Sequence, residues 1–154
     1  MSEPGGWKPA ELAEPAGRVN AASEPMTQPP AVGDVLPELR IEATPTFVIS
    51  SALATRDFQD VHHDRDAAVA RGSKDIFLNI LTTTGLVQRC VTDWAGPAAR
   101  VRGVAIRLGA PCYAGDTLVL GGRVVEVGAE VVVEVVGRCS LGDHVTGTVR
   151  VELP

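Results

Sequence analysis

The side chains best suited to chemistry lie in residues 57–64, Asp-Phe-Gln-Asp-Val-His-His-Asp, which carry two of the three histidines of the chain. Asp57 and His62 are five positions apart, with extended sequence predicted before them and a short helix after them. At such a strand-to-turn position both side chains can converge on one cavity. A carboxylate and an imidazole that meet in this way can hold a water molecule between them and exchange protons with a substrate.

That pair fits the hydration of an activated carbon–carbon double bond. One group takes a proton from water as the water oxygen attacks the β-carbon, and a proton is delivered to the α-carbon. The enolate oxygen that develops needs hydrogen-bond donors. We expect the free backbone N–H groups near Leu78 and Asn79, at the start of a long predicted helix, to supply them.

Other interpretations of the same residues remain open. On residue type alone, Asp57 is more simply a turn-forming or helix-capping residue, and His62 a half-buried histidine with its hydrogen bonds satisfied. A metal site built from His62, His63 and Asp64 is less favoured, because adjacent side chains project in different directions and no second ligand pair follows. We therefore predict no metal. The third histidine, His144, lies in a predicted hairpin and is expected at the surface.

Four positive side chains lie beside the motif and the predicted helix start, namely Arg56, Arg65, Arg71 and Lys74. They could bind the phosphates of a nucleotide-bearing thioester. A solvated charged face explains them equally well. Both interpretations stay open at this point.

The clearest single element is a helix predicted from about residue 75 to 95. Asp75 or Ser73 can cap its start, and Gly96-Pro97 supplies its end. We expect a close approach of the sheet backbone to explain Gly85 in mid-helix. Apolar residues and one threonine recur at three- and four-residue intervals and predict a buried face made of Phe77, Ile80, Leu81, Thr84, Val87, Val91 and Trp94.

After this helix the hydrophobic period changes from near 3.6 to 2. Val-rich stretches at 100–112, 116–128, 130–140 and 144–154 are separated by glycine-containing turns and predict four strands. Before the helix, Pro37 and Pro45 confine short extended runs to edge or entry positions, and residues 65–72 predict a short helix ended by Gly72. The order of elements favours an α+β fold, a curved antiparallel sheet wrapped around one long central helix.

Composition limits the partners and the compartment. The 154 residues suffice for one domain, and a formal net charge of -5 excludes nucleic acid or an anionic membrane surface as the main partner. The widely spaced Cys90, Cys112 and Cys139 support no disulfide framework and fit a reducing compartment. They are expected as packing residues, although Cys112 beside a turn could be exposed. With neither a signal-peptide pattern nor a membrane-spanning stretch, the chain is predicted to be cytoplasmic.

The first 30 residues hold six of the eleven prolines, with scattered Gly, Ser and Glu. Such a segment cannot bury enough apolar surface to offset its ordering entropy. We predict a flexible tail over residues 1–31 and one folded domain over residues 32–154.

The stretch from Thr55 to Asp64 resembles the signature of the MaoC-like, or R-specific, enoyl-CoA hydratases of hot-dog fold, which runs roughly Ser-Gly-Asp-x-Asn-Pro-(aliphatic)-His-x-Asp. The two catalytic positions of that family fall on Asp57 and His62. The family's Gly-Asp-Thr-Leu turn is also present, at residues 115–118. More narrowly, residues 52–97 are similar to the small catalytic subunits of actinobacterial steroid side-chain enoyl-CoA hydratases.

The resemblance implies hydration of an acyl-CoA thioester without a cofactor, by Asp57 and His62. It implies a substrate-positioning role for Gln59, where the family has Asn, and thioester binding at Leu78-Asn79, where the family has His-Gly. It also implies a heterotetramer with a second MaoC-like subunit, or a homodimer as the fallback. A hot-dog thioesterase and a non-catalytic acyl-binding subunit are the rival functions.

Overall fold

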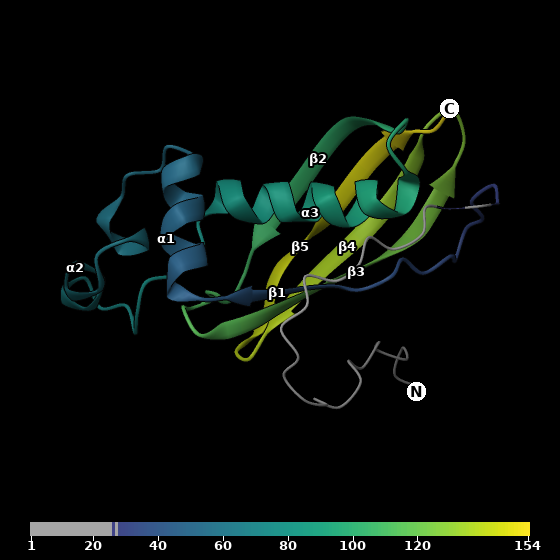
Figure 1. Ribbon diagram of the computed structural model, residues 1–154. Helices are drawn as coiled ribbons and strands as arrows, with labels where there is room; N and C mark the ends of the chain where they lie inside the picture. Colours follow the sequence, from purple (N-terminus) through teal and green to yellow (C-terminus); the bar gives the residue numbers. More distant parts are fainter. Residues whose placement is uncertain (1–25, 27) are drawn as a thin grey trace, which may run out of the picture.

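The computed structural model describes residue 26 and residues 28–154. Within this range, an antiparallel sheet of five strands curves around the long helix α3, Ile80–Ala95 (Figure 1). The strand order is β1-β3-β4-β5-β2. The predicted α+β hot-dog architecture is confirmed. The strand bounds are β1 Leu39–Ala43, β2 Arg100–Leu108, β3 Asp116–Val127, β4 Val131–Cys139 and β5 Gly142–Glu152.

The four strands after α3 follow the predicted alternation. In β4, Val131, Val133 and Val135 are buried, whereas Glu134 between them is exposed. Across the sheet, Val133 pairs with Val149 of β5. Each valine removed from water in this way contributes about 2 kcal/mol, so the inner sheet face supplies much of the core.

The end of α3 is as predicted, but its start is not. Gly96 has a φ of 88°, which ends the helix, whereas the first helical residue is Ile80 and the N-cap is Asn79. The predicted caps Ser73 and Asp75 are therefore wrong. The reason is tertiary. Phe77 forms an isolated antiparallel bridge with Tyr113, and this strand-like pairing keeps the residues before Asn79 out of the helix.

The buried face of α3 is also rotated from the predicted one. Ile80 and Leu81 are each about half exposed, at 49% and 51%, and Gly85 has open space where a Cβ would lie. No sheet backbone approaches Gly85, so that explanation was wrong. Val87, Val91 and Trp94 are buried as predicted, and the full set of buried residues of α3 is Thr82, Thr83, Leu86, Val87, Cys90, Val91 and Trp94.

Between β1 and α3 the chain forms three short helices. Extended structure was expected before the motif, yet helix α1 spans Pro45–Ala54, with Thr44 as its N-cap and Pro45 in its first turn. Proline is well suited to that position because an N–H group in the first turn has no acceptor within the helix, so its absence breaks no hydrogen bond. The 3-10 turn η1, Asp60–His62, and helix α2, Arg65–Ala70, follow. None of the helices in the described range is long and apolar enough to cross a membrane.

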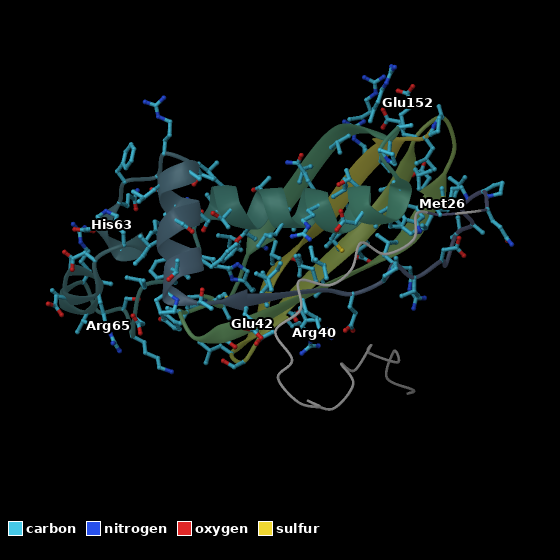
Figure 2. All side chains as sticks on the ribbon, viewed as in Figure 1. Met26, Arg40, Glu42, His63, Arg65 and Glu152 are labelled. Atoms are coloured by element: carbon cyan, nitrogen blue, oxygen red, sulfur yellow. The ribbon has the colours of Figure 1, made fainter. Side chains whose placement is uncertain are left out.

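The tail predicted over residues 1–31 lies mostly outside the described residues, and its boundary stays a prediction. The amide of Met26 donates to the carbonyl of Trp94, at 3.0 Å, near the end of α3. Met26 and Glu152 lie at one end of the molecule, whereas His63 and Arg65 lie at the other (Figure 2). The motif residues are therefore grouped at the end that carries α1 and α2 (Figure 1).

Candidate active site

Asp57 lies on a tight turn that follows α1. After Ala54 the chain reverses at Arg56, which adopts a left-handed φ of 58°, and the amide of Asp57 donates back to the carbonyl of Ala52 at 2.9 Å. A left-handed conformation at a residue with a side chain costs about 1 kcal/mol. The turn directs the Asp57 carboxylate toward the start of α3, where it accepts a hydrogen bond from Asn79.

His62, at the end of η1, faces this carboxylate. Its Nε2 atom lies 3.5 Å from Oδ2 of Asp57. The side chains of His62 and Asp57 are 8% and 18% exposed, so both are largely shielded from water. The two residues predicted to form an acid–base pair are thus brought together.

The other side of the His62 ring is anchored. Nδ1 lies 2.8 Å from the carbonyl oxygen of Phe77, and the Phe77 ring packs against the imidazole edge to face, with ring centroids 4.9 Å apart. Because a carbonyl oxygen only accepts, Nδ1 carries the proton in this hydrogen bond. Nε2 of the neutral ring is then an acceptor directed at Asp57.

The carboxylate of Asp57 is held from two directions. Oδ2 accepts a hydrogen bond from Nδ2 of Asn79 at 3.0 Å, and Oδ1 accepts one from the backbone amide of Gln59 at 3.3 Å. Both donors are neutral. Together these two donors give the carboxylate a defined orientation.

The start of α3 lies against this pair. The amide of Leu78 donates to the carbonyl of Cys112 at 3.0 Å and is not free, which corrects the expectation for that residue. Among the described residues, no partner is found for the amides of Asn79 and Ile80. These amides carry the positive end of the helix dipole, so a carbonyl oxygen could be bound there.

Residues 27–144 match the family model described as MaoC like domain. The chain belongs to the MaoC-like family. A curated relative from Mycobacterium tuberculosis (strain ATCC 25618 / H37Rv), named 3-oxo-4,17-pregnadiene-20-carboxyl-CoA hydratase beta subunit, is 63% identical over 123 residues, which are 79% of this chain and 95% of the relative. The family predicted from the motif at residues 55–64 is therefore confirmed.

Two solved structures share the fold of this MaoC-like chain. A chain from the crystal structure of the ChsH1-ChsH2 complex from Mycobacterium tuberculosis has 61% identity and a TM-score of 0.79, covering 84% of this chain and 100% of that one. The (R)-hydratase from A. caviae involved in PHA biosynthesis has 19% identity and a TM-score of 0.76, covering 83% and 100%. At that lower identity the likeness shows the fold alone.

Of the remaining predicted site residues of the MaoC-like domain, only Gln59 has a contact with the pair in the described part of the chain. Gln59 contacts Asp57 through its backbone, and its side chain is exposed. Arg65 pairs with Asp75 at 3.2 Å, and Arg71 pairs with Asp60 at 2.7 Å.

Phosphate binding by these cations stays a prediction. Lys74 lies 6.0 Å above the ring of Tyr113 and is exposed, as are Arg65 and Arg71. Exposed ion pairs contribute at most about 1 kcal/mol, so these side chains can exchange a carboxylate for a phosphate.

His144 is not at the surface, contrary to expectation. It is 2% exposed, its Nδ1 donates to the carbonyl of Ala110 at 2.8 Å, and its Nε2 accepts from the hydroxyl of Thr83 at 2.9 Å. Burial lowers the pKa of His144, while the Ala110 carbonyl and the charge of Asp116 oppose part of that shift. The ring joins α3 to β5 through Thr83.

The cysteines pack as expected, with one correction. Cys90 and Cys112 are buried, so the suggested exposure of Cys112 was wrong. Burial raises the pKa of each of these two thiols to about 12. Neither is a nucleophile at neutral pH.

Two contributions to the site were not found from sequence. The carbonyl of Phe77 orients His62, and the side chain of Asn79 holds Asp57. A backbone carbonyl leaves no signal in residue type. For Asn79, the available signal was an N-cap residue directly before the apolar run of α3.

Proposed function

We propose that this MaoC-like chain is the catalytic subunit of an enoyl-CoA hydratase. It adds water across the 2,3-double bond of an acyl-CoA thioester that carries a steroid side-chain remnant. The observation that carries the proposal is the Asp57–His62 pair beside the backbone amide of Asn79, for which the described residues provide no acceptor. The 63% identity to a 3-oxo-4,17-pregnadiene-20-carboxyl-CoA hydratase subunit supports the substrate class.

The pair is arranged to activate a water molecule. Oδ2 of Asp57 and Nε2 of neutral His62 are both acceptors, so one water can donate a hydrogen bond to each. As the water oxygen bonds to C3 of the substrate, its proton passes to the pair, and the pair returns a proton to C2. The sum is one water added, with no change in the protonation of the protein.

The thioester carbonyl is polarised at the start of α3. Charge that develops on its oxygen during the attack is stabilised by the amide of Asn79 and by the helix dipole. Arg65, Arg71 and Lys74 would meet the phosphates of CoA, and Gln59 would position the acyl part.

The chain works in a heteromeric assembly with a second MaoC-like subunit. Strand β2 is an edge of the sheet, and its outer side has no partner strand in the described part of the chain. Such an edge is suited to pairing with another chain. The relative is named as a beta subunit, and the similar structure is a two-component complex, which supports this partner. We place the assembly in the cytoplasm, where free thiols stay reduced.

The test is an assay of the purified chain, alone and with a co-expressed second MaoC-like subunit. Loss of the ultraviolet absorbance of a steroid enoyl-CoA measures hydration directly. We expect hydration by the complex and none of the thiol release that a thioesterase produces from the saturated acyl-CoA. If thiol were released without hydration, the thioesterase function would replace the proposal. If neither hydration nor thiol release were observed, the result would favour an acyl-binding subunit.

The assembly is tested on the same samples. Size-exclusion chromatography with mass measurement should give a complex that contains both chains. A stable homodimer that hydrates the thioester at the full rate without the second chain would contradict the heteromeric part of the proposal.

A further inference from the structure

We infer that the side-chain carboxamide of Asn79 is a positioning residue that fixes the Asp57 carboxylate for its reaction with water. This inference rests on the proposed hydratase function. It concerns a different part of Asn79 from the backbone amide that binds the thioester oxygen. Asn79 would then fix the position of the acid–base pair relative to the amide that binds the thioester carbonyl.

The carboxamide of Asn79 makes three hydrogen bonds within the site. Nδ2 donates to the hydroxyl of Thr55 at 2.9 Å and to Oδ2 of Asp57 at 3.0 Å, and Oδ1 accepts from the amide of Thr82 at 2.9 Å. Asn79 is 2% exposed. Two donor hydrogens and one acceptor are thus satisfied in a place where water cannot substitute for them.

The orientation of the amide is determined by its neighbours. The backbone N–H of Thr82 can only donate, so the atom that faces it must be Oδ1. A flipped amide would direct its oxygen at the carboxylate of Asp57 and its NH2 group at an N–H group. The NH2 group is therefore committed to Thr55 and Asp57.

This arrangement connects the end of α1 and the turn after it with the start of α3, which is more than 20 residues away in the chain. The hydroxyl of Thr55, at the end of α1, donates to the carbonyl of Ser51 and so accepts from Asn79. Asp57 follows on the turn, and Asn79 begins α3. If the carboxamide is removed, Oδ2 of Asp57 loses its only donor in the described range apart from a protonated His62. The carboxylate is then free to leave the His62 side.

The first test is Asn79→Ser in the assembled hydratase. Serine is as good an N-cap as asparagine and keeps the backbone amide, but its side chain is too short to reach Asp57. We expect kcat to fall about ten- to hundredfold, the loss typical of a misplaced reacting group, with KM within about threefold of wild type. An unchanged kcat would overturn the inference.

A double-mutant cycle separates positioning from a general structural role. In the Asp57→Asn background, the carboxylate that Asn79 positions is already gone, so Asn79→Ser should lower the residual rate by no more than about twofold. Full additivity of the two losses would show that Asn79 does not act through Asp57. Thr44→Ala is the matched control: it removes the cap hydroxyl that accepts from Phe47 in α1, and should lower the melting temperature without changing kcat.

A crystal structure of Asn79→Ser tests the inference independently of turnover. We expect α3 to start at the same residue and Oδ2 of Asp57 to move out of contact with Nε2 of His62. Retention of that contact would contradict the positioning role, even if the wild-type protein hydrates no enoyl-CoA. Absence of hydration by the wild type would instead count against the proposed function alone.

Discussion

Nδ1 of His62 lies 2.8 Å from the carbonyl oxygen of Phe77, and this contact determines which nitrogen of the ring is available for chemistry. With Nδ1 donating to the carbonyl, Nε2 is left facing Asp57. Phe77 belongs to the segment that bridges to Tyr113 and leads into α3. The orientation of the imidazole is therefore fixed by the same backbone that places the Asn79 amide.

Asp57→Asn and His62→Ala should each lower the hydration rate at least about a hundredfold, the usual contribution of a general acid–base group. Steady-state kinetics on the steroid enoyl-CoA would measure the loss, with circular dichroism to confirm the fold. His63→Ala is the matched control, because the His63 imidazole bonds to the carbonyl of Phe58 and has no bond to Asp57 in the described part of the chain. A rate near wild type in either test variant would show that the pair is misassigned.

The free energy of unfolding should fall as the pH drops below about 6.5. Burial lowers the pKa of His144 in the folded state, so below the ordinary value of about 6.5 the unfolded chain binds a proton that the folded chain does not. The contribution of His144 to the free energy of unfolding is complete above about pH 6.5. It is lost as the pH falls from there to the lowered pKa of the folded state. Urea unfolding at several pH values, for wild type and His144→Gln, measures the difference.

His144→Gln should be less stable at pH 7.5 by about 1–3 kcal/mol, because Thr83 and Ala110 lose well-placed partners. Its stability should then fall less than that of the wild type between about pH 7 and pH 5. Parallel curves for the two proteins would show that His144 does not contribute to the pH dependence.

Gly85→Ala should raise the free energy of unfolding by about 0.5–1 kcal/mol, because an added Cβ meets no atom of the described residues and alanine is the better helix former. Gly147→Ala should do the opposite and cost more than about 2 kcal/mol, since its Cβ would overlap the Ala105 carbonyl oxygen and lie 2.8 Å from Cα of Ile106. Urea unfolding compares the two. If Gly85→Ala destabilised the assembled protein but not the isolated chain, the result would indicate that a partner packs on that face.

Cys90 and Cys112 should resist alkylation in the native protein. Burial raises the pKa of both thiols to about 12, so at about pH 8 almost no reactive thiolate is present. Cys139 is partly exposed and should be modified first by iodoacetamide, as peptide mass spectrometry would show. Unfolded in urea, the chain should react at all three positions. Rapid labelling of Cys112 in the native protein would mean that the hydrogen bond from the amide of Leu78 to the carbonyl of Cys112 opens readily.

The sequence by itself determined the features that depend on neighbours along the chain. Alternating valines predicted the four strands after α3, because side chains of a strand point alternately to two faces. Gly96-Pro97 predicted the end of α3, because glycine tolerates a left-handed φ and proline cannot continue a helix. Asp57 and His62 were identified as a pair because one short loop carries both.

Tertiary structure decided what depends on residues far apart in the chain. Pairing of Phe77 with Tyr113 moved the start of α3 to Ile80, and packing of α3 on β5 buried His144 against Thr83, 61 positions away. The contact of Asn79 with Asp57, 22 positions apart, has the same origin. Hydrogen bonds are directional and of short range, so they form only where packing of whole elements brings donor and acceptor within about 3 Å, and no local pattern of residue types specifies that meeting.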